Sequence, residues 1–326
     1  MKKFNCKKVR MLSLGISIVL SIAMLSGCGA EKKEASATPA KEESSAASAE
    51  KQYDNSFSKD GVPSEKLTEL REKGTLLVGS SGDAPFAYID QATGEFSGVD
   101  AEIIKEVSKR LGIEKTQMEL IPFSELILNL NSDKIDIIAD CMYIRADRAE
   151  KIYFGEIWYT QGGGLLVPSE GSINGIEDFD SSSTVIGYTP GTVWQTSVEG
   201  WKEQGLIKEA RATGDQSESI VALQNGKING FLTDSTVLEN LFANTPDAVK
   251  GLKMAENYTD DESTIGRIAP SVNFDDIEFM KEVDAVVAKL RDEGFIDKVF
   301  EDYKLDPKLH MITNEERTHD INTKTE

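Results

Sequence analysis

The sequence has few of the residues that bind metals or form disulfides, with three cysteines and two histidines among 326 residues. Cys6 lies in a basic and apolar N-terminal segment, and Cys28 directly follows that segment. Only Cys141 is left for the folded part, so no intramolecular disulfide is expected, even in an oxidising compartment. Both histidines, His310 and His319, lie near the C-terminus, without a cysteine pair. A zinc or iron site is therefore not expected, and the sequence predicts no cofactor.

Long apolar runs are also scarce. Met11–Ser26 is apolar apart from a few serines, but it is shorter than the roughly 20 residues that a membrane-spanning helix needs. A basic segment followed by a short apolar one is typical of a signal peptide, which we predict to be residues 1–27. The basic residues that precede the apolar run are Lys2, Lys3, Lys7, Lys8 and Arg10.

The next segment predicts a membrane anchor and a tether. Residues 25–28, Leu-Ser-Gly-Cys, resemble the lipobox of bacterial lipoproteins, in which the Cys becomes the diacylated first residue after cleavage. The resemblance implies an extracytoplasmic protein held to the cell membrane through Cys28, and two acyl chains anchor firmly. Residues 28–58 are mostly Glu, Lys, Ala and Ser, so we expect a disordered tether that lets a folded head reach a partner in the same membrane.

Positive charge is in short supply as well. The formal net charge is −20, and removal of residues 1–27, which hold five Lys or Arg and no Asp or Glu, changes it to −25. Such an acidic protein repels nucleic-acid phosphates and anionic lipid headgroups. A nucleic-acid partner is therefore not expected.

The part that follows the tether has the pattern of an α/β fold. Apolar runs of strand length alternate with segments in which apolar residues recur at helical spacing, which predicts mostly parallel sheets. The predicted strands are Thr75–Gly79, Gln117–Ile121, Lys134–Ala139, Leu165–Val167, Thr184–Tyr188 and Ile228–Leu232. The predicted helices are Val99–Leu111, Ser124–Leu130, one from Thr192, one around Glu218–Gln224, and Phe279–Glu293. Ligands on such sheets bind at the carboxyl ends of strands.

Arg148 is the first candidate binding residue. The apolar run Ile135–Ala139 leads into a short polar loop, then to Arg148 and the aromatic pair Trp158 and Tyr159. A guanidinium just past a strand end is well suited to bidentate capture of a carboxylate. The alternative is a surface arginine paired with a nearby glutamate.

Seven stretches of the chain, in the same order and spacing, resemble the amino-acid-binding branch of the family-3 extracellular solute-binding proteins, which are receptors of ABC importers. They are LLVGSSGDAPFAY at 76–88, TGEFSGVDAEIIKEVSKRLG at 93–112, NSDKIDII at 131–138, IRADRAEKIYF at 144–154, VIGYTPGT at 185–192, ALQNGKINGFLTD at 222–234 and LRDEGFIDKVFEDYKL at 290–305. The resemblance implies a periplasmic-binding-protein-like (type II) fold, in which two α/β lobes are joined by a hinge of two crossover strands. It implies lobe 1 at 59–160 and 262–310, lobe 2 at 161–261 and a polar tail at 311–326.

The resemblance also assigns roles at the site. Arg148 matches the residue that grips the ligand carboxylate, and Gly191 and Thr192 match a helix start that meets the same carboxylate. Asp234 matches the carboxylate that accepts the ligand ammonium. Alternatively, Asp234 caps the helix that follows it. The matching apolar or aromatic walls are Phe123 and Phe86, for which ordinary core packing is the alternative.

The loop before Arg148 departs from the family. Where the family has small hydroxyl residues, this chain has Asp140, Cys141, Tyr143 and Arg145. Tyr143 would fill volume that the family leaves to the ligand. Asp83 stands where an aromatic is frequent, and with Asp140 it would either favour a cationic ligand, pair with Arg145 or cap loops.

The sequence thus predicts the binding receptor of an ABC importer. We expect a monomer that closes its lobes over a polar amino acid or a related small zwitterion and hands it to a permease in the same membrane. Two alternatives stay open. One is an enzyme of the same fold, similar to cyclohexadienyl dehydratase, and the other is a solute-sensing head that acts through a partner.

Overall fold

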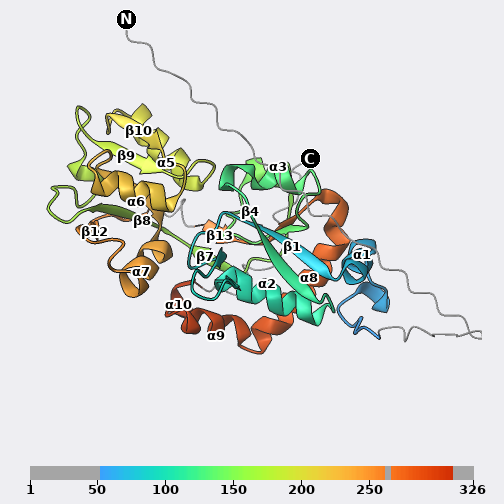
Figure 1. Cartoon of the computed structure of the whole chain (residues 1–326). Helices are drawn as coiled ribbons and strands as arrows, with labels where there is room; N and C mark the ends of the chain where they lie inside the picture. The colour runs from blue at the N-terminus through green and yellow to red at the C-terminus, as the bar shows by residue number, and fades with distance from the viewer. Residues whose placement is uncertain (1–51, 261–265, 311–326) are drawn as a thin grey trace, which may run out of the picture. The chain divides into compact units, whose positions relative to one another are not determined.

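The computed structural model describes residues 52–260 and 266–310, which belong to one compact unit, 51–326. The predicted signal peptide, Cys28, most of the predicted tether and the tail 311–326 lie outside the described residues. Two five-stranded sheets organise the unit, and each is flanked by helices to form one lobe (Figure 1). Among the helices of the described ranges, none combines the length and apolar character that a bilayer crossing requires.

The sheet of the first lobe has the strand order β4-β1-β5-β14-β6. β1 is parallel to β4 and β5, whereas β14 is antiparallel to both of its neighbours. The strands are β1 (Thr75–Ser80), β4 (Lys115–Leu120), β5 (Ile137–Ile138), β6 (Tyr153–Phe154) and β14 (Ser271–Val272), and a separate hairpin is formed by β2 (Tyr88–Ile89) and β3 (Phe96–Ser97). The helices of this lobe are α1 (Glu65–Lys73), α2 (Val99–Arg110), α3 (Leu126–Leu130), α4 (Ala146–Ala149), α8 (Ile277–Asp292), α9 (Phe295–Asp302) and α10 (Pro307–His310).

The sheet of the second lobe has the order β10-β9-β11-β8-β12. β9, β10 and β11 are parallel, and β8 is antiparallel to β11 and to β12. The strands are β8 (Gly163–Pro168), β9 (Val185–Tyr188), β10 (Glu209–Ala212), β11 (Gly230–Asp234) and β12 (Leu252–Met254), with helices α5 (Val193–Glu203), α6 (Gln216–Gln224) and α7 (Ser235–Asn244). Short 3-10 turns occur at Lys59–Gly61, Phe123–Glu125, Ile176–Asp178 and Phe274–Asp276.

Two crossover strands connect the lobes. β7 (Tyr159–Gln161) runs from the first lobe toward the second, and β13 (Gly266–Ile268) runs back, antiparallel to it. The predicted α/β fold, with two lobes and a hinge of two crossover strands, is confirmed.

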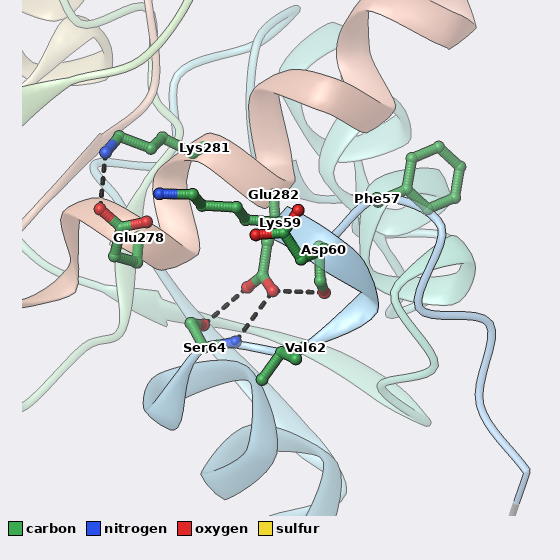
Figure 2. A pocket seen from close by; sticks show the side chains of 9 residues that line it. Phe57, Lys59, Asp60, Val62, Ser64, Glu278, Lys281 and Glu282 are labelled. Carbon is green, nitrogen blue, oxygen red and sulfur yellow. Dashed lines mark hydrogen bonds and ion pairs between the residues drawn. The ribbon is translucent and has the colours of Figure 1, made fainter.

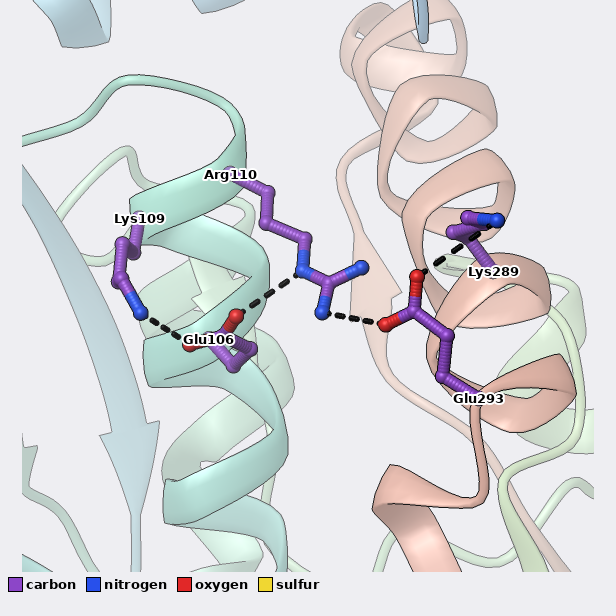
Figure 3. Close-up of polar contacts among 5 residues, drawn as sticks. All are labelled: Glu106, Lys109, Arg110, Lys289 and Glu293. Carbon is purple, nitrogen blue, oxygen red and sulfur yellow. Dashed lines mark hydrogen bonds and ion pairs between the residues drawn. The ribbon is translucent and has the colours of Figure 1, made fainter.

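Apolar helix faces account for the packing of the first lobe. In α8, Phe279, Val283 and Val287 recur at helical spacing and are fully buried. Ion pairs add to this on the surface, where Arg110 of α2 joins Glu106 of its own helix to Glu293 at the end of α8 (Figure 3). Surface pairs typically contribute only about 0–1 kcal/mol each. Burial of the apolar faces is therefore the larger contribution.

Glu282 of α8 attaches the start of the described chain to this lobe. Its carboxylate accepts hydrogen bonds from the Ser64 N–H (2.9 Å) and Ser64 Oγ (2.6 Å), and also from Ser58 Oγ (Figure 2). Ser64 in turn caps α1, because its Oγ accepts from the Leu67 N–H. Tyr53 lies upstream of both serines, and its ring centre is 4.4 Å from the guanidinium of Arg71 in α1. Residues 52–58, which the sequence assigned to the tether, therefore pack on the head.

Some predicted elements differ from the structure. β5 has two residues where a strand over 134–139 was predicted, because the Asp136 carboxylate accepts from the Leu77 N–H (2.9 Å) and pairs with Lys66 (2.9 Å) and Lys73 (3.1 Å). β11 begins at Gly230 rather than Ile228. β14 in the first sheet and β8 in the second are antiparallel to both of their neighbours, so parallel pairing is confined to β4-β1-β5 and β10-β9-β11.

Candidate functional site

A small cavity lies at the carboxyl ends of strands from both lobes. β1 and β5 are parallel neighbours in the first lobe, and β9 and β11 are parallel neighbours in the second. The loops that follow these strands meet at the cavity. Its volume is about 20 Å³, roughly the space of one water. It is lined by Asp83, Phe86, Phe123, Asp140, Cys141, Tyr143, Arg148, Thr192, Val193, Trp194 and Asp234.

The lining includes nine of the ten predicted ligand-binding residues. The tenth, Gly191, does not line the cavity, but its carbonyl contacts Arg148. The sequence therefore identified residues that the fold does bring together. Their binding roles stay predictions.

Arg148 bridges the two lobes. It is 5% exposed, and its Nη1 donates to the Tyr143 carbonyl (2.7 Å) while Nη2 donates across to the Gly191 carbonyl (2.8 Å). Its guanidinium also lies 5.3 Å from the ring centre of Phe123. Burial, with the nearby charge of Arg145, lowers the Arg148 pKa to about 10, so the group stays charged at neutral pH. No carboxylate within the described ranges forms an ion pair with it.

Gly191 and Thr192 form the turn from β9 into α5. Gly191 has φ +84°, and a Cβ there would lie 2.8 Å from Ser124 Cα of the first lobe. Glycine thus permits both the left-handed backbone and the close approach of the two lobes. Thr192 is the N-cap residue of α5, but its hydroxyl donates to the Thr189 carbonyl (2.7 Å) instead of capping the helix.

Asp234 ends β11 and faces the cavity. Although it occupies the N-cap position of α7, its side chain makes no capping hydrogen bond, so the predicted alternative of a helix cap is not what the structure contains. Its Oδ1 accepts instead from the Tyr143 hydroxyl of the first lobe (2.7 Å). Burial raises the Asp234 pKa to about 7.

The Tyr143 ring lies between the hinge and the second lobe. A Cβ on Gly266 of β13 would come within 1.8 Å of this ring, so the ring packs against the crossover strand at a point where only glycine leaves room. On the other side the ring meets Trp194 edge to face, with 5.9 Å between the ring centres. Burial raises the pKa of the phenol well above its usual value, so Tyr143 is a neutral donor to Asp234.

Asp140 and Asp83 share one serine. Asp140 Oδ2 accepts from the Ser81 N–H and from Ser81 Oγ (both 2.7 Å), and Asp83 Oδ2 lies 3.0 Å from the same Oγ. Asp140 Oδ1 lies 2.7 Å from Ser80 Oγ. Burial, and then the charge of Asp83, raise the Asp140 pKa to about 8.

Arg145 does not pair with these acids. Its Nε donates to Asp147 (2.9 Å) and its Nη1 to Thr196 (3.2 Å). The predicted pairing with Asp83 or Asp140 is therefore wrong. The physical reason is local, since Asp147 is two residues away and exposed on the same turn.

Cys141 and Phe86 take positions in the core beside the cavity. The Cys141 N–H donates to the buried Asp100 carboxylate (2.6 Å), which also accepts from the Tyr159 hydroxyl (2.8 Å). Burial raises the pKa of the Cys141 thiol, so it stays protonated. Phe86 stacks on Tyr159 at 6.1 Å between ring centres. Both side chains thus pack in the core and also line the cavity.

Sequence reasoning missed Trp194, Val193 and Asp100. Trp194 is 1% exposed, and its indole N–H has no hydrogen-bond partner, although it is close enough to Asp234 to lower the pKa of that carboxyl. Gly163 makes room for it, since a Cβ there would lie 2.6 Å from the indole ring. The only sequence signal was an aromatic residue in the first turn after Gly191.

Comparisons with known proteins agree with the fold. The chain is similar to the glutamine-binding protein of Geobacillus stearothermophilus (24% identical, covering 76% of this chain and 94% of that protein). It is also similar to the L-cystine-binding protein TcyA of Bacillus subtilis (24% identical, 88% and 94% covered).

Among solved structures, a mutant of ArgBP from T. maritima has a TM-score of 0.64 at 22% identity, covering 73% of this chain and 98% of that one. The ancestral amino acid-binding protein AncCDT-1, a precursor of cyclohexadienyl dehydratase, has a TM-score of 0.62 at 23% identity, with 73% and 99% covered. At these identities the likeness shows the fold alone. Residues 76–306, more than half of the chain, match the sequence model of one family. This protein therefore belongs to the bacterial extracellular solute-binding proteins, family 3.

Proposed function

We propose that this chain is the extracytoplasmic binding lipoprotein of an ABC importer, and that it captures an α-amino acid by closing two lobes over it. Arg148 holds the ligand carboxylate, and Asp234 holds the ligand ammonium. The lipid on Cys28 and the tether keep the head near a permease in the same membrane. The named relatives are binding proteins, which supports a solute-binding role.

One observation carries the assignment of the ligand. A guanidinium from the first lobe and a carboxylate from the second line the same cavity, and each is engaged by a group that resembles one end of an amino acid. Two carbonyl oxygens accept from Arg148, as two carboxylate oxygens would. The Tyr143 hydroxyl donates to Asp234, as an ammonium would. A ligand that brings both ends replaces these contacts when the lobes part and close again.

The first test is a thermal-shift screen of the purified chain against the L-amino acids. A ligand that binds only the folded state stabilises it by about 2.7 kcal/mol at a hundredfold excess over Kd, which is readily seen in the melting temperature. Failure of every amino acid to shift the melt would exclude this ligand class.

The second test is Arg148→Ala, with calorimetry on the ligand that the screen identifies. Removing one partner of a buried charge pair typically costs about 2–5 kcal/mol, so we expect affinity to fall roughly 30- to 4,000-fold. Arg211→Ala is the matched control, because Arg211 is half exposed, pairs with Glu209 and does not line the cavity. If Arg148→Ala bound as tightly as this control, the carboxylate assignment would be wrong.

A cleft enzyme of the same fold is the second candidate function. The observation that favours it is the Asp140 carboxyl, whose pKa of about 8 makes it a proton donor at neutral pH. Incubation of the protein with prephenate, followed by NMR over hours, distinguishes the two functions. Progressive loss of prephenate at a rate proportional to protein concentration would establish the enzyme.

A further inference from the structure

Arg145 is a charged residue beside the site for which the proposed ligand contacts have no role. It stands in the loop before Arg148, where this chain departs from the family, and it does not line the cavity. Its side chain is 33% exposed, and its Nε pairs with Asp147 (2.9 Å). That pair alone would be an ordinary surface ion pair of little consequence. The guanidinium makes a second contact, however, and this one leaves the first lobe.

The second contact of Arg145 joins the two lobes. Its Nη1 donates to Thr196 Oγ1 (3.2 Å), which belongs to α5 of the second lobe. The backbone next to Arg145 is fixed to the hinge, because the Ile144 N–H donates to the Arg267 carbonyl of β13 (2.9 Å). The pair with Asp147 orients the guanidinium, so less conformational freedom is lost when it reaches Thr196. A well-held part of the first lobe thus contacts the second lobe.

The same end of α5 meets the first lobe at two further points. Arg148 Nη2 donates to the Gly191 carbonyl (2.8 Å), and a Cβ on Gly191 would lie 2.8 Å from Ser124 Cα. Thr196 is the fourth residue of α5, so it lies within one turn of this close approach. Arg148 lines the cavity, whereas Arg145 does not. Arg145 can therefore stabilise the closed lobes without touching what lies between them.

A contact between closed lobes has a recognisable effect on binding. It stabilises the closed form by the same amount whichever ligand that form holds, so its loss raises Kd by one common factor. A ligand enters when the lobes are open, so its association rate does not depend on the contact. Dissociation requires the lobes to part, and it becomes faster when the contact is removed. Loss of a residue that touches the ligand changes affinity by a factor that differs from ligand to ligand.

We propose that Arg145 is a positioning residue that holds the lobes together through Thr196 and thereby determines how long a bound amino acid is retained. This inference rests on the proposed function, because it needs an amino acid to be captured between the lobes. Arg145 acts on the second lobe and not on the ligand, so it takes no part in the choice among amino acids.

The test is Thr196→Val, with stopped-flow measurement of the fluorescence of the purified chain, in which Trp194 lines the cavity. The probes are the individual L-amino acids that shift the melting temperature. Valine keeps the branched shape and every charge, including that of Arg145 near Arg148. We expect the dissociation rate constant to rise about two- to tenfold, which corresponds to the net contribution of one hydrogen bond. The association rate constant should be unchanged, and the factor should be the same for each amino acid.

Arg145→Ala is the second variant and completes a double-mutant cycle. It removes the donor of the same hydrogen bond, so it should also speed dissociation. The variant that carries both substitutions should dissociate no faster than Arg145→Ala alone, because Thr196 then has no donor to lose.

Two matched controls keep both lobes and remove only contacts within one lobe. Thr68→Val changes an exposed helix threonine whose hydroxyl donates to the Ser64 carbonyl of the same lobe (3.0 Å). Arg211→Ala removes an arginine whose Nε pairs with an acid two residues away, Glu209 (2.8 Å), as Arg145 does with Asp147. The Nη1 of Arg211 donates to the Lys227 carbonyl of its own lobe. Both controls should dissociate at the rate of the unmodified protein.

Three outcomes overturn the inference, and they are distinguishable. If an L-amino acid binds and Arg148→Ala weakens it, but Thr196→Val and Arg145→Ala dissociate like the controls, the interlobe role of Arg145 is disproved and the receptor stands. If the factor in Thr196→Val differs among amino acids, the residue acts on the ligand and the inference is also wrong. If no L-amino acid gives a saturable signal with the unmodified protein, the proposed function fails and the inference with it.

Discussion

At the scale of a single residue, we expect Tyr143 to compete with the ligand for Asp234. Its hydroxyl donates to the same carboxylate that we assign to the ligand ammonium, and its ring packs on the hinge strand. We therefore expect Tyr143→Phe to bind the ligand about three- to tenfold tighter. In the unmodified protein the ligand must first break the hydrogen bond from Tyr143 to Asp234, and a hydrogen bond to a charged group contributes about 1.5–3 kcal/mol. The gain in affinity is smaller than this, because water solvates the released hydroxyl and recovers part of the free energy. Calorimetry on the variant measures the change.

Tyr188→Phe is the matched control for this prediction. It also removes a phenol that donates to a carboxylate, Glu199 (2.8 Å), but it does not line the cavity. Affinity in this variant should stay within about twofold of the unmodified protein. Weaker binding by Tyr143→Phe would mean that the phenol contacts the ligand directly, and the competition would be disproved.

At the scale of elements, Glu282 joins α8 to the start of α1. The carboxylate is buried and accepts three hydrogen bonds from Ser58 and Ser64 (Figure 2). Glu282→Ala leaves those donors unpaired, so we expect the free energy of unfolding to fall by about 2–4 kcal/mol. Hydrogen exchange should become faster over residues 57–67, with ligand affinity unchanged.

Glu278 provides the control on the same helix. It is exposed and pairs only with Lys281 of its own helix within the described ranges. Exposed helix pairs contribute about 0.3–0.5 kcal/mol, so Glu278→Ala should barely change stability or exchange. Equal effects of the two substitutions would show that the helix itself, and not the junction, determines protection.

For the whole molecule, several buried carboxyls make stability depend on pH. Burial raises the pKa of Asp100 to about 6, of Asp234 and Asp284 to about 7 and of Asp140 to about 8, from an unfolded value of 3.8. The folded state thus binds more protons than the unfolded chain between about pH 4 and 8. The stabilisation is complete below the unfolded pKa and is lost as pH rises through the folded values.

We therefore expect a lower free energy of unfolding at pH 8 than at pH 5.5 in urea titrations. The growing net negative charge acts in the same direction. Asp284→Asn should reduce this pH dependence, because the amide still accepts from the Glu156 N–H but does not titrate. A stability that rose steadily from pH 5.5 to 8 would contradict the assignment of protons to these groups.

The sequence predicted which residues meet at the cavity better than it predicted the short strands of the first sheet. Arg148, Asp234 and Thr192 follow strands or begin helices in stretches with a clear pattern, so their convergence was foreseeable. β14 and β6 have two residues each, too few for any periodicity. Trp194 resembled an ordinary core residue of a helix, and Asp100 resembled a first-turn acid of α2. Their contacts, with Tyr143 and with Cys141, depend on packing that no local pattern encodes.

The attachment of Ser58 and Ser64 to Glu282 of α8 has a mechanical consequence. A load applied to the start of the chain enters the first lobe at Ser58 and Ser64 and is borne by the α1–α8 junction. It does not pass through β7 or β13. The crossover strands therefore carry no tension that enters the first lobe at this junction.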